Sequence, residues 1–154
     1  MIYLNLSIGY QNVEGLHSDL FGCKLESEIN LNCDIEILSE TWTSCKNCPN
    51  VKTPGYEIVD FINPEKIGKK GRSSGGLSIL CKTIFKSKVK VIRSSDKYIW
   101  FEIDKSIFEN LDHNVKICAI YSQPILSKYY TGILFGTILS QMFLILGPNS
   151  LLCA

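Results

Sequence analysis

The sequence lacks several features that would assign it quickly to a class of protein. Its five prolines and eleven glycines in 154 residues are ordinary amounts, which excludes collagen-like and low-complexity disordered chains. The first residues contain no basic stretch and no long apolar core, so no secretory signal is visible. We therefore expect an intracellular protein, cytoplasmic or nuclear, with reduced thiols. Cys45 and Cys48 have metal-ligand spacing, but no second such pair follows, which favours free thiols over structural zinc.

The chain also lacks a large excess of one charge, because it has 16 Lys and Arg residues and 15 Asp and Glu residues. The charges are nevertheless unevenly distributed. Residues 1–65 carry three basic and ten acidic side chains, net −7, whereas residues 66–97 carry ten basic and one acidic, net +9. An acidic segment followed by a basic one predicts a cation site near a surface that faces phosphate. Solvated charged faces are the alternative interpretation.

The hydrophobic pattern predicts a single α/β domain. Leu4–Gln11 alternates apolar and polar residues, which is typical of a strand, and Ile35–Leu38 is typical of a buried one. Between them, apolar residues at helical spacing predict a helix over 19–32. Asp104–Asn114 is expected to be a connection with one helical turn. The rest is strand-rich, with strands expected at Tyr56–Ile62, 75–80, Val89–Arg93, Tyr98–Ile103 and Val115–Tyr121.

The end of the chain differs from the rest, because no charged residue occurs from Tyr129 to Ala154. Ile133–Leu146 holds ten large apolar residues in fourteen. A buried helix running into a strand is the favoured interpretation of this apolar tail, 129–154. A membrane anchor over 129–152 is the alternative, although small and polar residues dilute the segment and no basic cluster flanks it.

Three polar residues stand where predicted strands end. Glu40 ends a predicted central strand, Asn12 ends the first strand, and Tyr121 ends the strand expected at Val115–Tyr121. Functional groups of open sheets gather at such ends, and a carboxylate there is costly unless paired or bound to a cation. Convergence of the three on one rim is therefore predicted, and turn or cap roles are the alternative.

A glycine- and cation-rich loop follows at 68–76. Its backbone N–H groups and side chains are suited to cradling phosphate. It is not a Walker loop, because Leu77 stands where that motif requires lysine. A flexible hairpin turn is the alternative. The candidate phosphate- or nucleic-acid-binding residues are Lys69, Lys70, Arg72, Ser73 and Ser74.

Four segments together carry a resemblance to a known family. They are Ile8–Leu16, Asp34–Trp42, Gly71–Gly76 and Cys118–Pro124, and Leu38-Ser-Glu-Thr-Trp42 is the most specific part. The chain resembles the endonuclease/exonuclease/phosphatase superfamily, most closely the endonuclease-like domains of LINE-type retrotransposon proteins. The resemblance covers roughly residues 4–128.

The resemblance implies a four-layered α/β sandwich and Mg²⁺-dependent cleavage of a phosphodiester, with nucleic acid, DNA first, as the partner and no small-molecule cofactor. It implies that Glu40 and Asn12 hold the metal and that Tyr121 contacts a phosphate oxygen, so these three are the candidate catalytic residues. Lys69, Lys70 and Arg72 would contact the nucleic-acid backbone without reading sequence. Residues 1–128 would be the N-terminal part of the domain, and 129–154 a divergent tail of helix plus strand.

The chain departs from the family where the second half should begin. The family's Gly-Asp-x-Asn segment is replaced by Gly147-Pro148-Asn149-Ser150, and the terminal Asp-His pair is absent. We therefore expect a partial sandwich, truncated after the first half, that is catalytically incomplete but retains weak nucleic-acid binding. Loss of most of the second sheet would expose on the order of ten large apolar side chains. The alternatives are a nuclease completed by tail residues or a partner, and a membrane-tethered interaction module.

Overall fold

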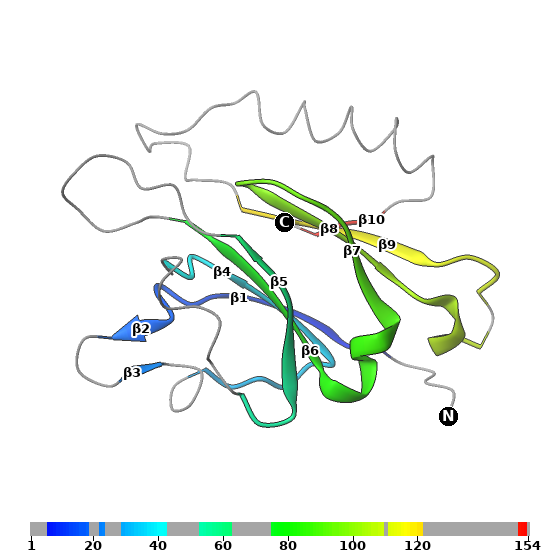
Figure 1. Ribbon diagram of the computed structural model, residues 1–154, viewed down its shortest axis with the longest axis horizontal. Coiled ribbons are helices and arrows are strands. Elements are labelled where there is room, and N and C mark those ends of the chain that lie inside the picture. Colours follow the sequence, from blue (N-terminus) through cyan, green and yellow to red (C-terminus); the bar gives the residue numbers. More distant parts are fainter. Residues whose placement is uncertain are drawn as a thin grey trace.

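The computed structural model describes residues 6–18, 22–23, 29–42, 53–62, 75–109, 111–121 and 151–153. These residues are mostly strand, and they form two four-stranded sheets that lie one above the other (Figure 1). Two short 3-10 helices accompany the strands, η2 (Thr83–Lys88) and η3 (Lys105–Ile107). At this coarse level the architecture agrees with the predicted α/β class.

The first sheet has the strand order β1-β4-β6-β5. Its strands are β1 (Ile8–Asn12), β4 (Ile35–Ser39), β5 (Tyr56–Ile62) and β6 (Leu77–Lys82). β1 and β4 are parallel, so both carboxyl ends lie at the same edge of the sheet. The other two neighbouring pairs are antiparallel. β4 is buried along its whole length. Burial of its apolar residues is expected for an inner strand, and its polar residues Glu36 and Ser39 are buried with them.

The second sheet has the strand order β10-β9-β8-β7. Its strands are β7 (Val89–Ser94), β8 (Tyr98–Ile103), β9 (Val115–Ile120) and β10 (Leu151–Cys153). β7, β8 and β9 form an antiparallel meander, and β10 adds in parallel to β9. The helix η2 carries the chain from the first sheet to the second, and η3 precedes the connection to β9.

The main core lies between the two sheets. Residues of β4 and β6 face residues of β8 and β9 across it, and Phe85 of η2 is buried in the same cluster. Its fully buried members include Ile35, Ile37, Ile79, Ile99, Phe101 and Ile103. A smaller cluster around Leu38 and Leu80 covers the other face of the first sheet. Both faces of that sheet are therefore held by packing, which fixes the positions of its strand ends.

Two expectations from the sequence are wrong. The helix expected over 19–32 is replaced, where the structure describes it, by a hairpin of β2 (His17–Ser18) and β3 (Gly22–Cys23), with non-helical backbone at 29–32. Glycine weakens a helix interior, which favours the hairpin at Gly22. The exposure of about ten large apolar side chains is not observed among the described residues either. β7, β8 and β9 form a second sheet with β10, residues of β8 and β9 pack against the first sheet, and five large apolar residues are exposed in the described part of the chain: Ile8, Tyr10, Ile84, Ile92 and Leu111.

Other expectations are confirmed. The strands predicted at Tyr56–Ile62 and Tyr98–Ile103 have these bounds in the structure, and η3 is the single helical turn expected after Asp104. Of the apolar tail, the structure describes only β10, so the predicted helix and most of the alternative anchor lie outside the described residues. Within the described residues, no helix has the length and apolar character needed to cross a membrane.

Candidate functional site

The candidate site lies at the rim where β1, β4 and β9 end, on the left in Figure 1. Asn12, the last residue of β1, is paired in register with Ser39, the last residue of β4. Glu40 follows Ser39 directly, and Tyr121 directly follows β9. The structure therefore brings Asn12, Glu40 and Tyr121 to one rim, as their strand-end positions predict.

Tyr121 and Glu40 are in direct contact across the two sheets. The Tyr121 hydroxyl donates a hydrogen bond to Glu40 Oε1 over 3.1 Å, although 81 positions separate the residues in sequence. Burial, and after it the adjacent negative charge of Glu40, raises the pKa of Tyr121 to about 12. Tyr121 is therefore a neutral hydrogen-bond donor throughout the physiological pH range.

The backbone around Glu40 is strained. Glu14, Glu40 and Trp42 have φ values of +45°, +54° and +48°, and they are the non-glycine residues with positive φ in the described part of the chain. L-residues rarely adopt this conformation, and such outliers gather where surrounding structure over-determines them, often at functional sites. All three lie within the two segments that leave β1 and β4. This local cost is a physical reason to regard the rim as more than a pair of turns.

Backbone hydrogen bonds hold the strained segment from both sides. The N–H groups of Gly15 and Leu16 donate to the carbonyls of Glu40 and Thr41 over 2.7 and 2.9 Å. On the other side, the Trp42 N–H donates to the Gly75 carbonyl over 3.1 Å. Glu40 is thus fixed between the chain leaving β1 and the chain entering β6.

Two glycines at this rim are required by close approach as well as by backbone conformation. A Cβ at Gly75 would lie 3.0 Å from Tyr121 Cε1, and Gly75 has φ +88°. A Cβ at Gly15 would lie 2.6 Å from Trp42 Cε3, at φ +92°. The two glycines therefore allow the rings of Tyr121 and Trp42 to pack against the backbone that frames Glu40.

Asn12 has a partly different environment. It is exposed, and its Oδ1 accepts a hydrogen bond from the Glu14 N–H over 3.1 Å, which forms a tight turn after β1. An amide oxygen has a second lone pair, and the described residues give its Nδ2 group no hydrogen bond. Asn12 therefore combines the turn role with polar atoms that can still reach a ligand.

The donor set at the rim is compatible with Mg²⁺. Glu40 is half-buried, and its Oε1 accepts from Tyr121, whereas Oε2 receives no hydrogen bond from the described residues. Mg²⁺ takes oxygen ligands and commonly binds proteins through one or two carboxylates while keeping several waters. Glu40 Oε2 and Asn12 Oδ1 are the oxygen atoms at these neighbouring strand ends that such a cation would use. No group of three or more His, Cys, Asp and Glu side chains arranged around a metal position occurs in the described ranges.

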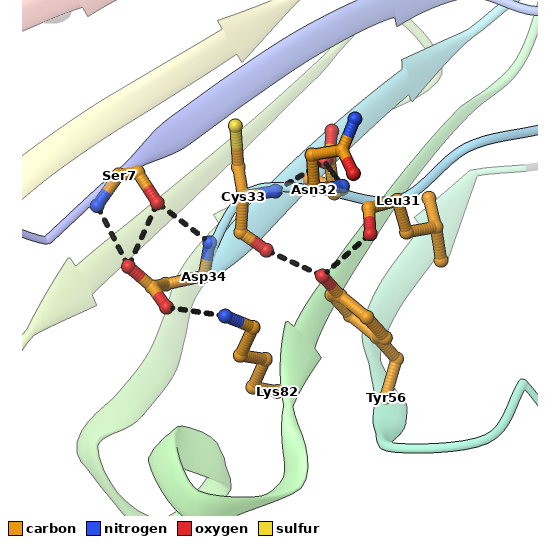
Figure 2. Close-up of polar contacts among 8 residues, drawn as sticks. Ser7, Leu31, Asn32, Cys33, Asp34, Tyr56 and Lys82 are labelled. Atoms are coloured by element: carbon orange, nitrogen blue, oxygen red, sulfur yellow. Dashed lines mark hydrogen bonds and ion pairs between the residues drawn. The ribbon is translucent and has the colours of Figure 1, made fainter.

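A second polar cluster lies at the opposite end of the first sheet (Figure 2). Asp34 accepts hydrogen bonds from the backbone N–H and the hydroxyl of Ser7 and forms an ion pair with Lys82 at 2.9 Å. Burial alone would raise the pKa of Asp34, but these hydrogen bonds outweigh it and lower the pKa. Tyr56 donates to the carbonyls of Leu31 and Cys33 beside it. These groups satisfy one another, so the cluster fastens β1 to β4 and β6.

The histidine–carboxylate pair of the described loops is remote from the rim. His113 Nδ1 and Asp112 Oδ1 are 2.5 Å apart in an exposed turn that precedes β9, whereas Tyr121 follows β9. At about 3.3 Å per residue, the strand separates the pair from Tyr121 by on the order of 20 Å. His113 is therefore not placed to serve Glu40.

Two residues of this rim are absent from the sequence-based candidates. The carbonyl of Lys97, in the turn between β7 and β8, accepts from the Tyr121 N–H over 3.0 Å. Tyr10 reaches the carbonyl of Ile120 from β1. Tyr10 and Asn12 lie on the same face of β1 because side chains alternate along a strand, so the sequence already contained the signal for Tyr10. The position of Lys97 depends on the pairing of β8 with β9, which the sequence pattern does not show.

The loop candidates Lys69, Lys70, Arg72, Ser73 and Ser74 lie outside the described residues, as do Cys45 and Cys48. The end of the loop is described. There the carbonyls of Gly75 and Gly76 accept hydrogen bonds from the backbone N–H groups of Trp42 and Thr41, which follow Glu40.

Comparison of the sequence with models of known protein families gave no match, and a search of curated proteins gave none either.

Proposed function

We propose that this chain binds the phosphodiester backbone of nucleic acid, DNA first, at the Glu40–Tyr121 rim with Mg²⁺ as the bound cation. In this proposal the two stacked sheets are the inner layers of an endonuclease/exonuclease/phosphatase sandwich of the LINE-type retrotransposon kind. The observation that carries the proposal is the hydrogen bond from Tyr121 to Glu40, which joins two strand ends of different sheets at a strained backbone.

Each residue has a role that its contacts support. Glu40 offers its Oε2 to the cation, and Asn12 offers an amide at the adjacent strand end. Tyr121 is neutral, and its single hydroxyl proton is donated to Glu40, so it would donate to a phosphate oxygen by exchanging that hydrogen bond when the cation takes the Glu40 carboxylate. Mg²⁺, when bound, offsets negative charge on the phosphate. Gly75 lies against Tyr121, and in the sequence Arg72 stands three positions before it, with Lys70 and Lys69 five and six positions before it.

We propose binding without efficient cleavage. Phosphodiester hydrolysis needs an activated water, and general bases for this step are most often histidines within hydrogen-bond reach. His113 is paired with Asp112 at the other end of β9. The segment Gly147-Pro148-Asn149-Ser150 carries no carboxylate where the resembling family has one.

Two measurements on the full chain test the proposal. Fluorescence anisotropy with labelled DNA should show binding that strengthens with Mg²⁺ and weakens as salt rises, because phosphate contacts release counterions. Glu40→Gln should remove most of the Mg²⁺ effect, and Glu57→Gln, an exposed carboxylate on β5, serves as the matched control. DNA retention unaffected by salt and by Mg²⁺ would contradict the proposal.

A nicking assay separates binding from catalysis. Supercoiled plasmid incubated with Mg²⁺ should be nicked no faster by the wild-type chain than by Glu40→Ala. Nicking by the wild type that Glu40→Ala abolishes would show instead an active nuclease, with its missing groups supplied by the tail or a partner.

A further inference from the structure

One face of β1 presents a row of exposed side chains that leads to the candidate site. Ile8, Tyr10 and Asn12 alternate along the strand, and all three are exposed, whereas Gly9 and Gln11 between them are partly buried. β1 is an edge strand of the first sheet. Residues two apart on a strand lie about 7 Å apart on the same face, so Tyr10 is the neighbour of Asn12 on this face.

The Tyr10 ring is held in place although it is exposed. Its hydroxyl donates to the carbonyl of Ile120 over 3.3 Å, which joins β1 of the first sheet to the end of β9 in the second. Ile120 immediately precedes Tyr121, so the hydrogen bond places Tyr10 beside the Tyr121–Glu40 pair. The polar end of Tyr10 is satisfied by the protein, yet 40% of the residue's surface remains open to solvent.

An anchored and exposed aromatic side chain beside a phosphate site has the properties of a stacking platform. Unpaired bases stack on such rings with little regard to their identity, because every base has a π-face. Bases within a duplex are already stacked and do not offer that face. The geometry therefore favours an unpaired nucleotide as the occupant of this position.

We propose that Tyr10 stacks against an unpaired base of single-stranded nucleic acid whose backbone phosphate lies at the Asn12–Glu40–Tyr121 rim. This inference rests on the proposed function and adds the recognised form of nucleic acid to it. It assigns a binding residue and makes no statement about cleavage.

The experiment compares two labelled probes by fluorescence anisotropy in the presence of Mg²⁺. One is a single-stranded oligothymidylate, and the other is an abasic oligonucleotide of the same length with the same number of phosphates. Tyr10→Leu keeps apolar bulk but removes the aromatic face, and Tyr10→Phe keeps the ring. Ile92→Ala is the matched surface control, because Ile92 is 39% exposed on β7, the edge strand of the other sheet.

We expect Tyr10→Leu to weaken oligothymidylate binding by about fivefold or more and to leave abasic binding within twofold. Tyr10→Phe keeps the ring but loses the hydrogen bond to Ile120, so its oligothymidylate binding should lie between those of the wild type and Tyr10→Leu. Ile92→Ala should bind both probes like the wild type. Equal losses on both probes would overturn the inference, because they would reveal a structural effect on the phosphate site. If Tyr10→Leu binds oligothymidylate as tightly as the wild type does, stacking is overturned but the proposed function is not. If the wild type binds neither probe, both the inference and the proposed function are overturned.

Discussion

The hydroxyl of Tyr121 in the second sheet donates to the carboxylate of Glu40 beyond the first sheet, over 3.1 Å. This contact joins the ends of two strands that the sequence separates by 81 positions. It buries the phenol beside a negative charge, and the other carboxylate oxygen, Oε2, receives no hydrogen bond from the described residues. The contact explains why the segment around Glu40 keeps a strained backbone, because Glu40 is held from both sheets.

The first prediction concerns the ionisation of Tyr121. Burial and the Glu40 charge raise its pKa from 10.0 to about 12, so its ¹³Cζ NMR signal should still be that of the neutral phenol at pH 11. Glu40→Gln removes the negative charge but not the burial, so we expect a lower pKa that stays above 10. The signal is assigned with Tyr121→Phe. No change in the titration of Tyr121 on Glu40→Gln would contradict the contact.

The same shift predicts a dependence of stability on pH. A phenol whose pKa is raised by folding stabilises the folded state fully below pH 10, and this contribution is lost as pH rises from 10 through about 12. Tyr121→Phe cannot ionise and should lack this component. Urea denaturation over that pH range measures it, and parallel curves for the two proteins would refute the linkage.

Gly75→Ala should disrupt the Tyr121 contact specifically. The new Cβ would lie 3.0 Å from the ring, in a backbone conformation unfavourable for alanine. Gly55→Ala is the matched control, because Gly55 has φ +80° and nothing within 4 Å of a Cβ. We expect Gly55→Ala to cost about 1 kcal/mol of unfolding free energy from the backbone alone. Gly75→Ala should cost about 1–3 kcal/mol more and should lower the pKa of Tyr121. Equal costs would show that the ring contact carries no energy.

The Asp34–Lys82 cluster should stabilise the fold in a pH-dependent way. Hydrogen bonds from Ser7 and Lys82 lower the pKa of Asp34 against the effect of burial, so its contribution is present above about pH 4 and is lost as pH falls through the lowered pKa. Asp34→Asn should lose about 1 kcal/mol at pH 7, because Lys82 is 39% exposed and water screens the pair. Denaturation at pH 3–7 measures the difference, which should shrink in acid. A difference that stays constant would exclude the linkage.

The second sheet should contribute to the core as strongly as the first. Phe101 of β8 is fully buried between the sheets, so Phe101→Ala should cost about 3–5 kcal/mol. Ile84→Ala is the surface control, because Ile84 is 63% exposed on η2, and its cost should stay below about 0.5 kcal/mol. A small cost at Phe101 would contradict the packing of the two sheets.

The strands could be predicted because the pattern of residue types that favours a strand is local in the sequence. The aromatic and β-branched residues of Tyr56–Ile62 and Tyr98–Ile103 favour strands, and the predicted bounds agree with the structure. Of the helix expected over 19–32, the structure describes residues 22–23 and 29–32, which are not helical, because apolar residues at helical spacing do not outweigh Gly22 and the backbone pairing of His17 with Cys23. Periodicity alone does not include such pairing.

The site was predictable only in part, for a similar reason. Strand-end position brought Asn12 and Glu40 together, since β1 and β4 are parallel neighbours. The contact of Glu40 with Tyr121, and the closeness of Lys97 and Tyr10, depend on how the second sheet lies on the first. That arrangement results from packing between residues far apart in sequence, which no local pattern encodes. The functional roles of these residues stay predictions.

The central proposal is that Glu40 binds a divalent cation beside Tyr121, and paramagnetic NMR tests it most directly. Mn²⁺, added to the full chain in place of Mg²⁺, should broaden the ¹³Cζ signal of Tyr121 at low occupancy. Excess Mg²⁺ should restore the signal, and Glu40→Gln should prevent the broadening while Glu57→Gln does not. A Tyr121 signal that Mn²⁺ leaves sharp, or that broadens equally in Glu40→Gln, would contradict the claim.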